Sequence, residues 1–392
     1  MQCDYFDAGA CRSCAFMGEP HADQLTRKDR AARALVAEVR PGAGVAWEAP
    51  FAPPEAGFRN KAKMVAGGTV EAPTLGILDG DGHGVDLHGV DLRGCGLHEP
   101  AIVAALPVLA SFVTTARLVP YDVPTRRGEL KHVLVTCSPD GELMVRWVLR
   151  STEALSRLRK HLPALAAALA EAGAPLRVAS VNLQPEHKAV LEGPEEVVLT
   201  EDETLPMRLS GSAAGAVTLH LRPQAFFQTS TVVAQALYAT AAAWVRDAAP
   251  ASVVDLYCGV GGFALHLAAV APGTRVHGVE ISAEAVAAAR RSAAEAGLPA
   301  TFTAGDATAW AADGTPDLVV VNPPRRGLGA DLCASIEDAA PPLVLYSSCH
   351  ATTLARDLGD LPSYDPVRAQ VLDMFPQTAH HETLVLLRRR EP

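Results

Sequence analysis

Residues 217–392 alternate between short apolar runs and longer alanine-rich runs, and this alternation constrains the fold more than any other feature of the chain. The apolar runs have the length of strands and lie at residues 253–256, 276–279, 318–321 and 343–346. The alanine-rich runs have the length of helices and lie at residues 232–245 and 283–296. Strands and helices that alternate in this way form a parallel sheet with helices on both faces. We therefore expect a doubly wound, Rossmann-like α/β domain.

The preceding residues follow a different pattern. Three alternating apolar runs are typical of strands in a mostly antiparallel sheet, and they lie at residues 131–137, 143–149 and 178–183. Residues 153–172 have the leucine and alanine spacing of an amphipathic helix, whereas residues 1–30 are polar and show little periodicity. We predict an α+β domain at residues 1–215 and the α/β domain at residues 216–392, with the small-residue segment 210–216 as the hinge.

Composition limits the classes of protein to which the chain can belong. Of its 392 residues, 49% are hydrophobic and 20% are charged, so we expect a packed core rather than disorder. The net charge of −10 argues against a protein that coats nucleic acid without specificity, because such proteins are usually basic. The net charge does not exclude a local basic face, since residues 117–160 hold nine basic and five acidic residues.

The cysteines and the N-terminus indicate a cytoplasmic protein. The chain has eight cysteines, and its first residues lack the basic and apolar regions of a secretory signal. In a reducing compartment, cysteines serve metals or catalysis rather than disulfides. The best apolar stretch, residues 101–113, contains Pro107 and is shorter than the roughly 20 residues of a membrane helix. We therefore expect no membrane association.

A glycine-rich turn, residues 259–262, follows the first strand of the α/β domain. Such a turn lets a ligand approach backbone N–H groups closely. Asp255 precedes the turn, and Glu280 follows it by about 20 residues, where an acid accepts hydrogen bonds from ribose hydroxyls. The G-x-G-x-x-G pattern is absent, and NPP stands at residues 322–324. These features point to S-adenosylmethionine rather than NAD; the alternative is a tight turn that binds no ligand.

Two further residues stand where later strands are expected to end. Asp306 could contact the adenine of the cofactor, and it could equally cap a helix. Cys349 closes the sequence SSC after the strand at 343–346, at the sheet edge where α/β proteins bind ligands. A buried cysteine usually serves as a small apolar residue. The polar, turn-forming surroundings of Cys349, next to the cofactor edge, favour a nucleophile.

Four motifs resemble those of the RNA uracil-C5 methyltransferases. They are RPQAFFQTS at 222–230, NPPRRG at 322–327, SSC at 347–349 and HHE at 380–382. The spacing of Cys3, Cys11 and Cys14, together with FRNKAKM at 58–64, narrows the resemblance to the branch that modifies 23S ribosomal RNA. The resemblance covers essentially the whole chain.

The resemblance implies roles for individual residues. Cys349 matches the family's nucleophile, which adds to C6 of uracil, and Glu382 matches the base that removes the C5 proton. The residues that match the family's contacts to S-adenosylmethionine are Gln228, Tyr257, Glu280 and Asn322. Two positions depart from the pattern: Asn322 replaces an aspartate of related branches, and His350 follows the cysteine where asparagine is common.

The N-terminal cysteines suggest a metal centre. In the family, the cysteines that match Cys3, Cys11 and Cys14 are joined by a distant fourth, for which Cys95 is the candidate, and the four imply a [4Fe-4S] cluster. The spacing alone fits a zinc site as well as an iron–sulfur cluster, because His88 and His98 lie near Cys95 in the sequence. The other thiols, Cys137, Cys258 and Cys333, are interpreted as core or turn residues.

The resemblance implies methylation of uracil C5 at position 747 of 23S ribosomal RNA, by a monomer. Another ribosomal uridine, transfer RNA, an adenine amino group or a non-catalytic RNA-binding role are the alternatives. Adenine enzymes usually carry an aromatic residue after NPP, where this chain has Arg325. We expect the N-terminal domain to bind RNA. The candidates for phosphate contacts are Arg59, Lys61, Lys63, Arg325, Arg326 and the basic residues of 117–160.

Overall fold

The computed structural model describes residues 1–78, 89–188, 190–212, 215–307, 310 and 314–391. Their contacts divide the chain into two compact units. The first unit comprises residues 1–17 and 54–207, and the second comprises residues 18–53 and 208–392. The predicted domains at 1–215 and 216–392 differ from this division chiefly in residues 18–53, which group with the second unit. The domain boundary at residue 215 stays a prediction.

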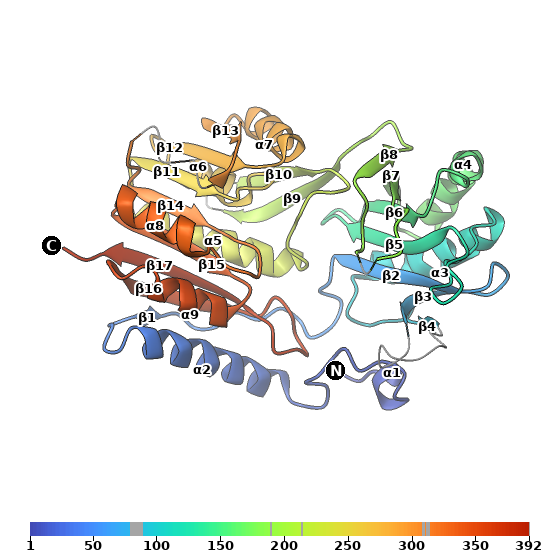
Figure 1. Ribbon diagram of the computed structural model, residues 1–392, viewed down its shortest axis with the longest axis horizontal. Helices are drawn as coiled ribbons and strands as arrows, with labels where there is room; N and C mark the ends of the chain where they lie inside the picture. The colour runs from blue at the N-terminus through green and yellow to red at the C-terminus, as the bar shows by residue number, and fades with distance from the viewer. Residues whose placement is uncertain (79–88, 189, 213–214, 308–309, 311–313, 392) are drawn as a thin grey trace. The chain divides into compact units, whose positions relative to one another are not determined.

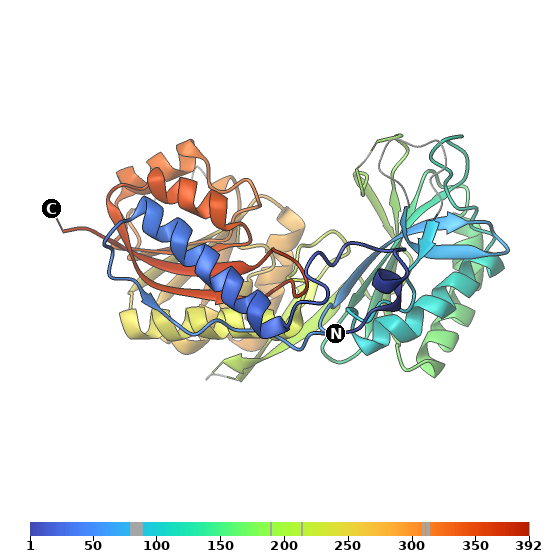
Figure 2. The same ribbon diagram turned by 90° about the horizontal axis from the view of Figure 1, so that it is seen from below.

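The first unit is built on a seven-stranded sheet. In spatial order its strands are β4 (Gly89–Asp91), β3 (Pro73–Leu78), β2 (Lys61–Gly68), β5 (Leu130–Cys137), β6 (Leu143–Leu149), β7 (Leu176–Leu183) and β8 (Glu195–Val198). Only β6 and β7 run parallel among these neighbours, which confirms the mostly antiparallel prediction. Helices α3 (Pro100–Thr115) and α4 (Leu155–Glu171) cover one face (Figure 2), and the short α1 (Asp4–Asp7) lies near the N-terminus.

Alternation along the strands gives this sheet two chemically different faces. In β5, Val133 and Val135 pack in the core against α3 and α4, together with Trp147 of β6. Successive side chains of a strand point to opposite faces, so His132 and Lys63 lie on the face away from the helices. This face also carries Lys61 and Arg146.

The second unit contains an eight-stranded sheet (Figure 1). In spatial order its strands are β1 (Ala46–Trp47), β16 (Tyr364–Leu372), β17 (Glu382–Arg389), β15 (Leu343–Ser348), β14 (Leu318–Val321), β11 (Ser252–Leu256), β12 (Arg275–Glu280) and β13 (Ala300–Ala304). The strands from β15 to β13 are parallel to one another, whereas β17 runs antiparallel to β15 and β16. The predicted doubly wound α/β fold is confirmed.

Helices cover both faces of this sheet (Figure 2). One face carries α2 (His21–Val39), α8 (Ala330–Ala339) and α9 (Ala351–Gly359), and the other carries α5 (Thr231–Ala248), α6 (Gly262–Val270) and α7 (Ala283–Ala296). The sequence reading does not predict α2, because only four of its 19 residues are buried: Gln24, Lys28, Ala32 and Val36. Its register follows from tertiary packing rather than from an apolar stripe.

The predicted hinge at 210–216 differs from the structure where the structure describes it. Residues 210–212 belong to β9 (Leu205–Ser212), and residues 215–216 belong to β10 (Gly215–Leu221). The two strands form a separate two-stranded sheet, so these residues are paired rather than extended as a linker. Residues 213–214 lie outside the described residues. In the described part of the chain, no helix is both long and apolar enough to span a membrane.

Candidate active site

Most of the predicted site residues stand at one edge of the sheet in the second unit. Tyr257 follows β11, Glu280 ends β12, Asn322 follows β14, and Cys349 follows β15. The carboxyl ends of parallel strands meet at one edge, where α/β proteins bind ligands. Glu382 comes to the same edge by another route, because β17 runs antiparallel to β15 and begins where β15 ends, with Ser348 paired to Thr383.

The glycine-rich turn after β11 is shaped by backbone and packing constraints. Gly261, the N-cap of α6, has φ of +89°, and Tyr257 has φ of +61°. A Cβ on Gly262 would lie 2.4 Å from the Tyr238 hydroxyl, so only glycine fits there. Such a turn at the start of a helix directs backbone N–H groups at a ligand. It therefore provides one wall of a cofactor site.

Two carboxylates flank this turn. Glu280 accepts hydrogen bonds from the backbone N–H groups of Gly259 (3.1 Å) and Ser282 (3.0 Å), which fixes its side chain at the edge. Asp255 is fully buried and accepts one hydrogen bond, from the N–H of Ala264 at 3.0 Å. Its Oδ1 has no partner among the described residues, and burial raises the pKa of Asp255 to about 8. A buried oxygen without a partner is costly, so a ligand that brings a hydrogen-bond donor to this turn would stabilise it.

Cys349 and Glu382 stand close enough at this edge for the charge of Glu382 to act on the thiol. Glu382 is 1% exposed, and its Oε1 accepts a 2.5 Å hydrogen bond from the Ser347 hydroxyl. Burial raises the pKa of Glu382 to about 7, despite this hydrogen bond. Such a carboxyl exchanges protons near neutral pH and is suited to act as a general base.

Arg325 and Glu382 act on the Cys349 thiol with opposite signs. Cys349 is half-buried, and burial raises its pKa, as does the charge of Glu382. Arg325 lowers the pKa through its charge and a hydrogen bond. When Glu382 is protonated, its repulsion disappears and the cation remains, so the thiolate forms more easily. The proton state of Glu382 therefore affects that of Cys349.

Helix α2 holds the segment that precedes Glu382. The Lys28 ammonium donates to Asp373 at 2.6 Å and to the carbonyl of Phe375 at 3.1 Å, and Lys28 is 2% exposed. Gln24 accepts from the N–H of Gln377 at 3.0 Å, and the two side-chain amides are also bonded. Sequence reasoning missed these residues and Ser347. The SSC motif contains Ser347, but only the pairing of β15 with β17 shows that it reaches Glu382.

His350 caps the helix that follows Cys349. Its Nδ1 accepts from the backbone N–H of Thr353 at 3.3 Å, at the N-terminus of α9. An asparagine side chain makes this type of capping bond as well. His350 therefore makes the kind of capping bond that an asparagine can make at this position.

The other predicted cofactor residues border the same edge. Gln228 is 5% exposed and lies just before α5, whose N-cap is Ser230. Tyr257 is half-buried, and burial raises its pKa while Arg326 opposes this shift. The charge of Asp306 also acts on Tyr257, which places Asp306 near the turn. Asn322 is half-buried at the end of β14.

The four predicted metal-binding cysteines come together in the first unit. Burial raises the pKa of Cys14 to about 11, and the charges of Cys95, Cys11 and Cys3 add to this shift. Cys14 packs against Phe58 and Leu97 in a small apolar cluster that Cys95 adjoins. Arg59 lies near Cys14 and Cys95, so it faces the thiols rather than sharing a surface with Lys61 and Lys63. His88 lies outside the described residues.

A second group of metal-type ligands is satisfied by the protein itself. Cys333, Asp357 and Asp360 bring ligand atoms within 4.8 Å of one another. However, Asp357 is fully buried and accepts hydrogen bonds from the Tyr346 hydroxyl and the backbone N–H of Leu328, both at 2.7 Å. Arg356 also pairs with it at 2.8 Å. These partners give Asp357 a structural role in the core.

Comparisons with known proteins agree with this geometry. Residues 228–338 match the family described as Methyltransferase small domain, and residues 313–390 match the family described as tRNA (Uracil-5-)-methyltransferase. The crystal structure of the Pyrococcus abyssi tRNA (uracil-54, C5)-methyltransferase in complex with S-adenosyl-L-homocysteine has a TM-score of 0.74. It is 22% identical, and the match covers 96% of this chain and 84% of that chain. This likeness shows the methyltransferase fold.

Two full-length relatives bear the same description, 23S rRNA (uracil(747)-C(5))-methyltransferase RlmC. The protein of Halothiobacillus neapolitanus is 48% identical over 396 residues, which cover 99% of this chain and all of the relative. The protein of Cronobacter sakazakii is 47% identical over 393 residues, with the same coverage. With this identity over nearly its whole length, the chain belongs to the RlmC family of 23S rRNA (uracil(747)-C(5))-methyltransferases.

Proposed function

We propose that this protein methylates C5 of uridine 747 in 23S ribosomal RNA, with S-adenosylmethionine as the methyl donor. One observation carries the chemical part of the proposal: a half-buried thiol, Cys349, and a buried carboxyl of pKa about 7, Glu382, stand at the ligand-binding edge of a methyltransferase sheet. The relatives' shared description supports the choice of RNA and position.

The chemistry of uracil explains why both groups are required. C5 is a weak nucleophile until the thiolate of Cys349 adds to C6, because this addition turns the ring into an enolate. The C5 carbon of the enolate then takes the methyl group. Glu382 removes the remaining C5 proton, the C5–C6 double bond reforms, and the Cys349 thiolate leaves. The thiolate is regenerated, and Glu382 passes its proton to solvent before the next turnover.

We assign the cofactor to the edge between Gln228 and Asn322. S-adenosylmethionine supplies an electrophilic methyl group when it is bound. Glu280 is positioned for the ribose hydroxyls, and Tyr257 lies beside the glycine turn. Gln228 has an amide that both donates and accepts hydrogen bonds, which suits the methionine part. The unpartnered Oδ1 of Asp255 supports a donor-bearing ligand at this turn.

We assign a [4Fe-4S] cluster to Cys3, Cys11, Cys14 and Cys95. Burial and the charges of the neighbouring thiols raise the pKa of Cys14 and of Cys95, and crowded thiolates of this kind become favourable as ligands of a cation. Sulfur ligands of a zinc ion, at about 2.3 Å from the metal, lie within roughly 4 Å of one another. Among the described residues, the single group of three or more ligand atoms within 4.8 Å of one another is at Cys333, so no three of the four thiols lie that close together. This spacing favours the larger cluster.

Tritium release tests the function directly. Unmodified 23S rRNA and tRNA transcripts, labelled with tritium at uracil C5, are incubated with S-adenosylmethionine and the purified protein. We expect release from 23S rRNA alone. Release from tRNA would keep the mechanism and change the substrate. Methyl incorporation without tritium release would exclude C5 chemistry and favour an adenine amino group.

A cysteine substitution tests the cluster. We expect anaerobically purified protein to be brown and to contain about four irons, and Cys11→Ser to lose most of both. Cys349→Ser is the matched control, since it removes a thiol from the second unit and should retain the iron. A colourless wild-type protein with one zinc would contradict the assignment. That the protein acts as a monomer in the cytoplasm stays a prediction.

A further inference from the structure

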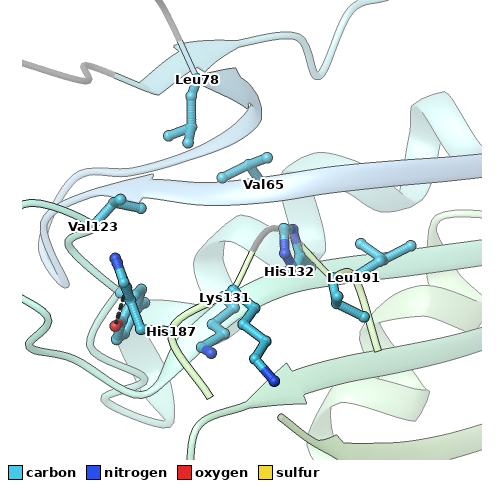
Figure 3. Close-up of a pocket in the computed structure, with 10 residues that line it drawn as sticks. Val65, Leu78, Val123, Lys131, His132, His187 and Leu191 are labelled. Carbon is cyan, nitrogen blue, oxygen red and sulfur yellow. Dashed lines mark hydrogen bonds between the residues drawn. The ribbon is translucent and has the colours of Figure 1, made fainter. Parts of the chain in front are cut away.

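A pocket of about 430 Å³ lies in the first unit, far in sequence from the methyltransferase edge (Figure 3). Val65 of β2 and His132 of β5, which are directly paired, contribute to its lining. Their neighbours Met64 and Val133 point into the core below α3 and α4. The pocket therefore opens on the polar face of the sheet, opposite the helices.

The walls of the pocket suit a flat aromatic ligand. Val65, Leu78 and Leu191 provide apolar sides. Tyr121 is held in place, because its hydroxyl is hydrogen-bonded to Nδ1 of His187 at 3.0 Å and the Lys131 ammonium lies 4.9 Å from its ring centroid. An aromatic ring that is already fixed loses little entropy when a base stacks on it. The volume falls in the range of small-molecule sites.

The charges around the pocket suit a phosphate. Lys131 and Lys188 line it, and none of its described lining residues is acidic. Lys188 pairs with Glu186 at 2.6 Å, but both are more than half exposed, so this pair is weak and exchangeable.

Lys61 and Lys63 lie on the same face of the sheet. Burial, and then the charges of Lys63 and Arg146, lower the pKa of Lys61 to about 8. Arg146 is itself paired with Glu192 and Glu196, so among the described residues the lysines supply the unpaired positive charge of this face.

We propose that this pocket binds an unstacked nucleotide of the RNA substrate other than the target uridine, with its base against Tyr121 and its phosphate near Lys131 and Lys188. The inference rests on the proposed function. A target uridine must leave its stack to reach the catalytic edge, and this exposes the bases beside it. An apolar pocket with one aromatic face and a lysine rim is the combination that holds a single-stranded nucleotide.

His132 gives the pocket a means of reading the base. Burial and the nearby Lys131 lower the pKa of His132 to about 4, so its imidazole is neutral at physiological pH. A neutral imidazole offers one donor and one acceptor, which match the edge of a base rather than a phosphate. The pocket thereby separates a charged rim from a neutral interior.

Substitution of Tyr121 tests the proposal in the full-length protein. Tyr121→Leu keeps the apolar volume and removes the ring, and Tyr121→Phe keeps the ring and removes the hydroxyl. For a transcript containing uridine 747 and its surroundings, we expect Tyr121→Leu to raise the RNA Kd and KM about tenfold or more. We expect Tyr121→Phe to change them much less. The kcat and the KM for S-adenosylmethionine should stay unchanged in both.

A second pair of variants covers the case in which Tyr121→Leu folds poorly. Val190 lines the pocket and is 53% exposed, so a substitution there leaves the core intact. Val190→Asp places a negative charge where we expect a phosphate and should weaken RNA binding. Val190→Lys has a comparable change in polarity and should not weaken it. Equal RNA affinities for the two variants would overturn the proposal.

Photocrosslinking locates the nucleotide. A transcript with 4-thiouridine at positions other than 747 should crosslink to a peptide that contains Tyr121 or Val190, and Val190→Asp should reduce the yield. Wild-type protein that methylates the transcript, with RNA affinity unaffected by Tyr121→Leu and Val190→Asp, would overturn the pocket and leave the proposed function intact. Wild-type protein that binds the transcript through this pocket without methylating it would overturn the proposed function alone.

Discussion

The two units of the molecule present polar residues in different ways. In the second unit, parallel strands bring Tyr257, Glu280, Asn322 and Cys349 to one edge, where a small number of groups act on one ligand. In the first unit, antiparallel strands spread polar and basic residues over one face of the sheet. An edge brings a few polar groups close together, whereas a face offers a larger surface for contacts with a ligand. We therefore expect substitutions at the edge to remove activity and substitutions on the face to change affinity by degrees.

The largest effect is expected at the nucleophile. Cys349→Ala should lower turnover by at least about 10³-fold, because the ring cannot be activated without addition at C6. The same variant should form no covalent adduct with RNA that carries 5-fluorouracil at the target, as judged by denaturing gels.

The control for this variant is Cys333→Ala. Cys333 is fully buried among the core residues of α8, so its loss should reduce stability and leave turnover of the folded protein near that of the wild type. Turnover by Cys349→Ala comparable to that of Cys333→Ala would remove Cys349 from the mechanism.

The next largest effect is expected at the base. Glu382→Gln should lower turnover by about 10²- to 10⁴-fold and accumulate the methylated adduct, because the C5 proton is not removed. In the wild type, kcat should rise with pH through about 7, where Glu382 ionises. A pH profile that is flat between 5.5 and 8 would contradict the role of Glu382 as the base.

The same substitution should stabilise the protein at alkaline pH. The pKa of Glu382 is raised from an ordinary 4.5 to about 7, so its contribution to folding is fully present below about pH 4.5 and is lost as the pH rises to 7. At pH 8 the wild type carries a penalty of at most roughly 3 kcal/mol that a neutral glutamine lacks. We expect a higher Tm for Glu382→Gln at pH 8 and little difference at pH 4.5. A lower Tm at pH 8 would mean that the carboxylate is stabilised by partners that a neutral glutamine cannot satisfy.

Local sequence patterns predict the residues at the sheet edge better than the residues that hold them in place. The strands before Tyr257, Asn322 and Cys349 are largely apolar runs, so the sheet and the order of its ends follow from periodicity. The contact of Ser347 with Glu382 joins residues 35 apart in sequence through an antiparallel register, which no local pattern specifies. Helix α2 was missed for a related reason. Lys28 is polar and is buried because it pairs with Asp373, 345 positions away in the sequence.

A further test uses the buried Lys28 and asks whether α2 belongs functionally to the second unit. Removing one partner of a buried ion pair leaves the other without compensation, so Lys28→Met should cost about 3–5 kcal/mol of stability. The loss should appear as reduced Tm and weaker cofactor binding, with the iron content of the first unit unchanged. Arg27 lies on the same helix and pairs at the surface with Glu19, which precedes the helix, so Arg27→Ala should cost less than about 1 kcal/mol. Equal costs for the two variants would mean that α2 is not held by the buried pair.

The smallest effect is expected on the polar face of the first unit. Lys63 is exposed on β2, at a position paired with Leu134 of β5. If the face contacts phosphates, Lys63→Gln should weaken RNA binding a few-fold and lower the salt slope of log Kd by about one, because one fewer counterion is released. The kcat should not change, since no reacting atom is involved.

Lys160→Gln is the control for this variant. It removes an exposed lysine from α4, on the opposite side of the sheet, and should leave the RNA affinity and the salt slope unchanged. If Lys160→Gln rather than Lys63→Gln weakens binding, the helices of the first unit contact the RNA, and the polar face needs another explanation.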